Sequence, residues 1–141
     1  MHSDIKKKLP IGWYLKEADS LITQYINASF EAFGIGRFHW QVMKNIDTHT
    51  KISKALYYHQ VSRFLSKAEL EEILQSLASR NWVQQDEDMY SFTPTGKTKF
   101  DEIAANQQGN HEKILAGTTT DEYLATINFL ETIIKNMGGK I

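Results

Sequence analysis

The sequence contains no cysteine among its 141 residues. Disulfide bonds, thiolate nucleophiles and cysteine-based zinc sites are therefore excluded. The sequence also lacks any apolar run of about 18 residues, and its mean hydropathy is -0.44, so we expect no membrane-spanning helix. No apolar stretch follows the lysines at positions 6–8, so we expect no signal peptide and a cytoplasmic location.

An excess of positive charge is missing as well, because the net charge is -1. Any affinity for nucleic acid must therefore come from a local arrangement of lysines, arginines and backbone groups. No nucleophile elbow, phosphate loop or His-Glu-x-x-His motif is present. The histidines are scattered, and His111-Glu112 has no evident further ligands, whereas a metal site needs about three or four. The sequence predicts neither an enzyme nor a protein with a cofactor or metal site.

Apolar residues recur at steps of three and four along most of the chain, which is the period of amphipathic helices. The predicted helices cover 12–33, 38–46, 53–61, 66–81, 94–115 and 120–137, and the predicted strands cover 82–83 and 89–92 around a turn at 85–88. The polar residues 47–50 predict a turn before the third helix, in which Leu56, Tyr57 and Val61 are expected to face inward.

The middle of the chain has the local plan of a winged helix-turn-helix. Ser66 and Glu69 fit a capping box at the start of one helix, which leads directly into the predicted hairpin. The segment 93–96, Thr-Pro-Thr-Gly, then begins another helix, because proline suits the first turn of a helix. The usual task of this plan is to hold one helix in a DNA groove. The helix at 66–80 is therefore the predicted recognition helix.

The long helices at the two ends of the chain carry wide apolar stripes. A lone winged-helix core cannot cover all of this surface, and exposing it in a monomer would leave a large apolar patch. We therefore expect an isologous homodimer in which the helices at 12–33 and 95–137 pack against their partners.

Four short segments, in this order and spacing, resemble the MarR family of bacterial transcriptional regulators. The family pattern Leu-Gly-Leu-Thr-x-x-Gln-Trp-x-Val-Leu corresponds to FGIGRFHWQVM at 33–43, and Leu-x-x-x-Gly-Leu-Val corresponds to LASRNWV at 77–83. Leu-Thr-Pro-x-Gly corresponds to FTPTG at 92–96, and Leu-Ser-x-Glu-Glu is echoed by TTTDE at 118–122. The resemblance covers about residues 12–137.

This resemblance implies one MarR-like domain over 1–141 that is mainly α-helical with a small β-hairpin wing. A winged helix-turn-helix at 36–93 would be flanked by the dimerisation helices at 12–33 and 95–137. The implied function is that of a homodimeric transcriptional regulator that binds a pseudo-palindromic operator in double-stranded DNA.

The charges of the recognition helix and the wing depart from the family pattern. The family wing usually carries an arginine that enters the minor groove, whereas the segment 84–88 contains no arginine or lysine. Glu71 and Glu72 can accept hydrogen bonds from cytosine amino groups, or they can be a solvated helix face that repels phosphates. The alternative function is therefore a winged-helix module that has lost DNA binding and engages a protein partner through its acidic surface.

Two sets of residues are the candidate binding sites. The expected DNA contacts come from the starts of the third helix and the recognition helix, the turn between them, and the wing: Ser53, Lys54, Arg63, Ser66, Lys67, Ala68, Glu71, Glu72 and Gln85. In the resembled family, small aromatic acids and phenols bind at the junction of the dimerisation and DNA-binding parts. The matching residues here are Trp13, Phe30, His39, Trp40 and Met43, although aromatic residues at helical spacing also fit a core.

Overall fold

The structure is a computed structural model that describes residues 7–140. The chain divides into two compact units, the first ending at Gln107 and the second beginning at Gln108. The elements of the chain, in order, are α2 (Ile11–Glu31), α3 (Arg37–His49), β1 (Lys51–Ser53), α4 (Lys54–Val61), α5 (Lys67–Ser79), β2 (Val83–Asp86), β3 (Met89–Phe92), α6 (Pro94–Ile114) and α7 (Thr120–Asn136). The fold is mainly α-helical with a small sheet, as the sequence predicts.

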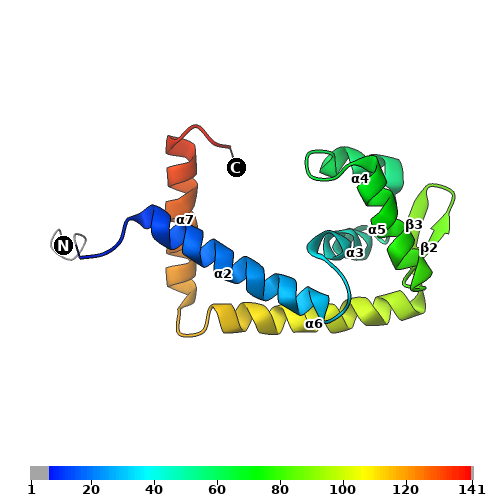
Figure 1. Ribbon diagram of the computed structural model, residues 1–141, viewed down its shortest axis with the longest axis horizontal. Coiled ribbons are helices and arrows are strands. Elements are labelled where there is room, and N and C mark those ends of the chain that lie inside the picture. The colour runs from blue at the N-terminus through cyan, green and yellow to red at the C-terminus, as the bar shows by residue number, and fades with distance from the viewer. Residues whose placement is uncertain (1–6, 141) are drawn as a thin grey trace. The chain divides into compact units, whose positions relative to one another are not determined.

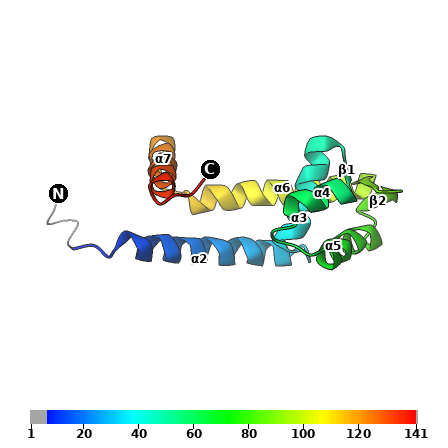
Figure 2. The same cartoon turned by 90° about the horizontal axis from the view of Figure 1, so that it is seen from above.

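The first unit contains a winged helix-turn-helix. Figures 1 and 2 show α3, α4 and α5 gathered beside the β2–β3 hairpin. Their inward faces form one apolar core, in which Met43, Leu70, Leu74 and Tyr90 are fully buried. The core fixes the position of α5, whose other face is exposed to solvent.

The sheet has a third strand that is not predicted from the sequence. Its order is β1-β3-β2, and both pairs of strands are antiparallel. In β1, Ile52 pairs with Tyr90 and is itself buried. A strand of three residues carries too short an alternation to be found by periodicity.

Three local predictions around the sheet were wrong. The predicted turn at 47–50 is mostly helix, because α3 continues to His49. Thr50, which has a φ of 72°, is the residue after the end of the helix. The hairpin turn is tighter than expected, since β2 reaches Asp86 and the left-handed residue is Glu87. Leu56 does not face inward but is 68% exposed, whereas Tyr57 and Val61 are buried as predicted.

The start of α6 depends on a close approach between two backbone segments. Thr93 donates its backbone N–H to the carbonyl oxygen of Trp82 at 3.1 Å, and its hydroxyl accepts from the N–H of Gly96 at 3.0 Å. A Cβ atom at position 96 would overlap the carbonyl group of Trp82. The Thr-Pro-x-Gly segment therefore ties the wing to α6, and its glycine is required by space.

The second unit contains the end of α6 and the whole of α7. Thr119 and Glu122 form a capping box at the start of α7, and Gly117 makes the preceding turn with a φ of 83°. No residue of α7 is buried, and Leu124 and Phe129 are more than half exposed. Within residues 7–140, none of the helices combines the length and the apolar character needed to cross a membrane.

Candidate nucleic-acid interface

The candidate interface begins at two serine-capped helix starts. The hydroxyl of Ser53 accepts a hydrogen bond from the N–H of Leu56 at 3.3 Å, which caps α4. At the start of α5, Ser66 accepts from the N–H of Glu69 at 3.1 Å, and the Glu69 carboxylate accepts from the N–H of Ser66 at 2.9 Å. The predicted capping box is therefore present, and it fixes where the exposed first turn of α5 begins.

An ion pair joins these two helices. The ammonium group of Lys54 lies 3.0 Å from the carboxylate of Glu71, which also accepts a hydrogen bond from the side chain of Gln75 at 3.1 Å. The bond to Lys54, together with that to Gln75, lowers the pKa of Glu71, and the bond to Glu71 raises the pKa of Lys54. Glu71 is therefore a carboxylate with two partners in the chain.

The wing turn is joined to the start of α4 through Asp88. Its carboxylate accepts hydrogen bonds from the hydroxyl of Ser53 and from the N–H of Ala55 at 3.2 Å, and its backbone carbonyl accepts from the N–H of Lys54 at 2.9 Å. These bonds, with Ser53 first, lower the pKa of Asp88. Asp88 lies in the turn predicted at 85–88, but its side chain contacts the start of α4.

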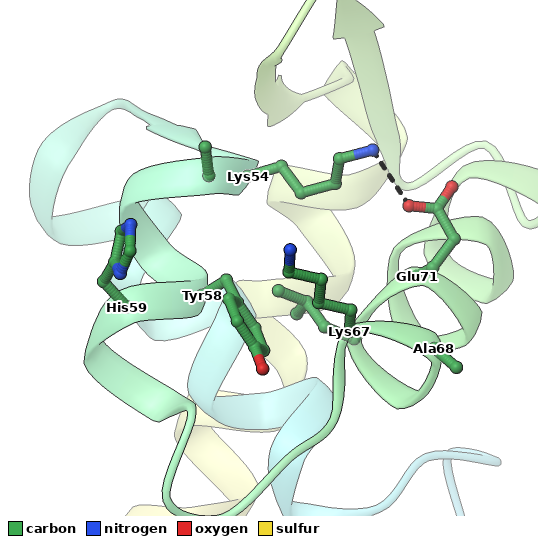
Figure 3. A pocket seen from close by; sticks show the side chains of 8 residues that line it. Lys54, Tyr58, His59, Lys67, Ala68 and Glu71 are labelled. Carbon is green, nitrogen blue, oxygen red and sulfur yellow. Dashed lines mark hydrogen bonds and ion pairs between the residues drawn. The ribbon is translucent and has the colours of Figure 1, made fainter.

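A hollow of about 560 Å³ lies between α4 and the first turns of α5 (Figure 3). Its walls are mainly apolar, and the ammonium group of Lys67 lies 5.6 Å from the centre of the Tyr58 ring. The lining residues are Lys54, Ala55, Tyr58, His59, Lys67, Ala68, Leu70 and Glu71. The structure therefore brings together four of the predicted DNA contacts: Lys54, Lys67, Ala68 and Glu71.

The other predicted DNA contacts lie around this hollow or on the wing. Arg63 is exposed in the turn between α4 and α5, with its guanidinium 5.7 Å from the centre of the Phe64 ring. Glu72 is exposed on α5. Gln85 is exposed on β2 and donates to the carbonyl of Glu87 at 2.9 Å.

The predicted ligand-binding residues do not all lie together. Phe30 and Met43 are buried in the core, and Trp40 stacks on Phe100 with the ring centres 5.0 Å apart. Trp13 lies 17 residues before Phe30 on α2, or about 25 Å along the helix at a rise of about 1.5 Å per residue, and is half exposed. Phe30, Met43 and Trp40 are therefore packing residues, and Trp13 is a surface residue. His39 is the fifth predicted residue.

His39 is half-buried near the α2–α3 turn, and its Nδ1 accepts a hydrogen bond from the N–H of Gly36 at 3.2 Å. Burial, and then the nearby charge of Arg80, lower the pKa of His39. Arg80 comes from the end of α5 and donates to the carbonyls of Phe33 and Gly34. This link is not predicted from the sequence, since its partners are more than 40 positions apart.

Across residues 7–140, no group of three or more histidine, aspartate or glutamate side chains is arranged to hold a metal ion.

Comparisons with known proteins support the fold through structure alone. No protein-family model matches the chain, and no curated protein matches it in sequence. The reduced form of MarR from E. coli superposes with a TM-score of 0.70 at 17% identity, covering 92% of this chain and 97% of that chain. A MarR family protein of Mycobacterium tuberculosis in complex with DNA gives a TM-score of 0.73 at 15% identity, covering 89% of this chain and 98% of that chain.

A structure of the Mycobacterium tuberculosis protein in complex with salicylic acid gives a TM-score of 0.63 at 15% identity, covering 89% of this chain and 99% of that chain. Structural similarity at such low sequence identity shows the fold and nothing more. The chain has a MarR-like winged-helix fold, and this prediction from the sequence is confirmed.

Proposed function

We propose that this protein is a DNA-binding transcriptional regulator that acts as a homodimer on a pseudo-palindromic operator. The observation that carries the proposal is the exposed first turn of α5, which Ser66 caps and which carries Lys67 beside Lys54 of α4. A helix that is buried on one face and exposed on the other, with a cation at its start, has the form needed to enter a major groove. Lysine contacts to phosphates would supply affinity without reading sequence.

The homodimer is supported by apolar surface on α2 and α7. On α2, Trp13 and Leu21 are about half exposed, and on α7 Leu124 and Phe129 are more than half exposed. Burial of apolar surface contributes roughly 25 cal/mol for each Å². A second copy of the chain that covers these faces would therefore stabilise both protomers, and two recognition helices could then read two half-sites.

A small aromatic ligand is a further part of the proposal. The Mycobacterium tuberculosis structure in complex with salicylic acid supports this class of ligand. In this chain, His39 would supply the polar group beside its chain neighbour Trp40, whereas Trp13 lies too far from Phe30 along α2 to belong to the same site. Such a ligand changes DNA binding only if its affinity differs between the two conformations of the protein. A titration with salicylate, followed by tryptophan fluorescence and repeated on His39→Gln, tests this part.

A second function is favoured by the exposed carboxylates of Glu72, Asp86 and Glu87. These groups lie on the recognition helix and the wing, where they would repel phosphates. On this alternative, the acidic surface engages a basic protein partner and the winged helix no longer binds DNA.

Selection of bound fragments from a genomic library, followed by footprinting, tests the proposed regulator. We expect two protected half-sites whose centres lie about 10 base pairs apart or at a multiple of that spacing. Enrichment of no fragment above background would favour the protein-interaction module.

A further inference from the structure

The start of α4 presents three groups that can bind an anion. They are the hydroxyl of Ser53, the backbone N–H of Ala55 and the ammonium group of Lys54. Two carboxylates of the same chain already occupy them, because Asp88 accepts from the first two and Glu71 pairs with Lys54. A DNA phosphate that approaches α4 therefore meets a site already filled by negative charge.

The two carboxylates are held very differently. Asp88 is fixed from several sides, since its backbone carbonyl also accepts from the N–H of Lys54 and its neighbour Met89 pairs with Ser53 in the sheet. Glu71 contacts α4 through its side chain alone. The side chains of Lys54 and Glu71 are 37% and 43% exposed. Ion pairs with this exposure are weak and open readily to solvent. Of the two contacts, the pair between Lys54 and Glu71 is the one that can exchange.

We propose that Glu71 is an internal substitute for a DNA phosphate, which holds Lys54 in the free protein and gives it up when DNA binds. This inference rests on the proposed function of DNA binding. On this proposal, Glu71 does not contact bases and does not act mainly by repelling phosphates. It weakens binding because it occupies Lys54. The exchange lowers the affinity for all duplexes by the free energy of the broken pair, and so keeps sequence-independent binding weak.

The exchange also affects the salt dependence of binding. Each lysine that neutralises a phosphate releases a condensed counterion, which steepens the slope of log K against log salt by about 0.9. Lys54 is already neutralised by Glu71, and the freed Glu71 carboxylate gathers cations when DNA binds. As long as Glu71 is present, Lys54 therefore contributes less than about 0.9 to the slope of log K against log salt.

A double-mutant cycle on the full chain tests the proposal. The variants are Glu71→Gln, Lys54→Gln and the two together, and Glu72→Gln is the matched control because it removes the same charge from the exposed neighbouring position. The measurement is the affinity for one operator duplex and one unrelated duplex across salt concentrations, with a melting curve to establish that each variant is folded. The probe is a fluorescent duplex followed by anisotropy.

We expect Glu71→Gln to strengthen binding to both duplexes by about two- to fivefold per protomer beyond the effect of Glu72→Gln, which is the range for an exposed pair. We expect it to steepen the salt slope by up to about 0.9 per protomer. In the Lys54→Gln background, the effect of Glu71→Gln should fall to that of Glu72→Gln.

Two results would overturn the proposal while leaving DNA binding in place. An equal gain from Glu71→Gln in both Lys54 backgrounds would mean simple repulsion, and weakened binding to the operator alone would mean base reading. If neither the natural chain nor Glu71→Gln binds any duplex at about 50 mM salt, the proposed function fails and this inference fails with it.

Discussion

The carboxylate of Asp88 accepts a hydrogen bond from the hydroxyl of Ser53, which lies 35 positions earlier in the chain. Ser53 in turn accepts from the N–H of Leu56, so the turn of the wing and the cap of α4 form one hydrogen-bonded unit. The wing is thus fixed to the helix-turn-helix at its tip as well as through the sheet.

Asp88→Ala should lower the melting temperature, because it removes the carboxylate oxygen that accepts hydrogen bonds from both Ser53 and Ala55. The free energy of unfolding of the variant should also depend less on pH in the acid range. The pKa of Asp88 is lowered in the folded protein, so its contribution is present above about pH 4, the ordinary range of an aspartate, and is lost as the pH falls through the folded value. Urea unfolding between about pH 2 and pH 7 measures both effects.

The control for Asp88 is Asp86→Ala, which removes a charge at an exposed position at the end of β2, next to the turn. It should leave the melting temperature close to that of the natural chain. Equal losses in the two variants would show that net charge, rather than the contact with Ser53, determines the effect.

The second prediction compares two glycines of α6. Gly96→Ala should destabilise the fold, because the new Cβ atom would overlap the carbonyl group of Trp82. Gly109→Ala should instead stabilise it by about 1 kcal/mol, since alanine favours a helix over glycine and the added Cβ meets no described atom within 4 Å beyond the adjacent residues and backbone of its own helix. Thermal unfolding of both variants gives the comparison, and a neutral Gly96→Ala would contradict the close approach of the two segments.

The third prediction concerns the start of the wing. Trp82 is only 8% exposed, and the guanidinium of Arg80 lies 5.1 Å from its ring centre. Trp82→Ala should cost about 3–5 kcal/mol, as expected for truncation of a large buried side chain. Gln84→Ala, at an exposed position on β2, is the control and should have little effect. A loss below about 1 kcal/mol for Trp82→Ala would contradict its role in the core.

The fourth prediction concerns the proposed homodimer. Sedimentation at micromolar concentration should give about twice the mass of the chain, since the apolar faces of α2 and α7 need a partner. Ile127→Asp should dissociate or unfold the dimer, because it would bury an unpaired charge at the interface. Asn128→Asp adds the same charge at the neighbouring polar position and should be tolerated. A well-folded monomer of the natural chain would contradict the proposal.

The features that the sequence predicts correctly are those fixed by neighbouring residues. Ser66 and Glu69 are three positions apart, so a capping box can be recognised before any packing is known. Asn81 ends the predicted recognition helix with a φ of 63°, in the left-handed region that asparagine tolerates. Caps, turns and apolar periodicity therefore predict most of the fold.

The contacts that shape the candidate site depend on packing between distant segments. Lys54 and Glu71 are 17 positions apart, and the partners Ser53 and Asp88 are twice as far. Nothing in the pattern of the acidic residues distinguishes Asp88, which turns toward α4, from Asp86, which is exposed. The sequence predicts which elements carry the charges, but their partners emerge only when the core fixes α4, α5 and the wing together.

The most direct test of the proposed function is the salt dependence of duplex binding by the natural chain and by Lys67→Ala. Lys67 lies in the first turn of α5, and no ion pair to it is found among the described residues. We expect the affinity to fall as salt rises, and Lys67→Ala to weaken binding to all sequences and flatten the slope by roughly one unit per protomer. Absence of salt-dependent binding to any duplex, even at about 50 mM salt, would contradict the account and leave the protein-interaction module in its place.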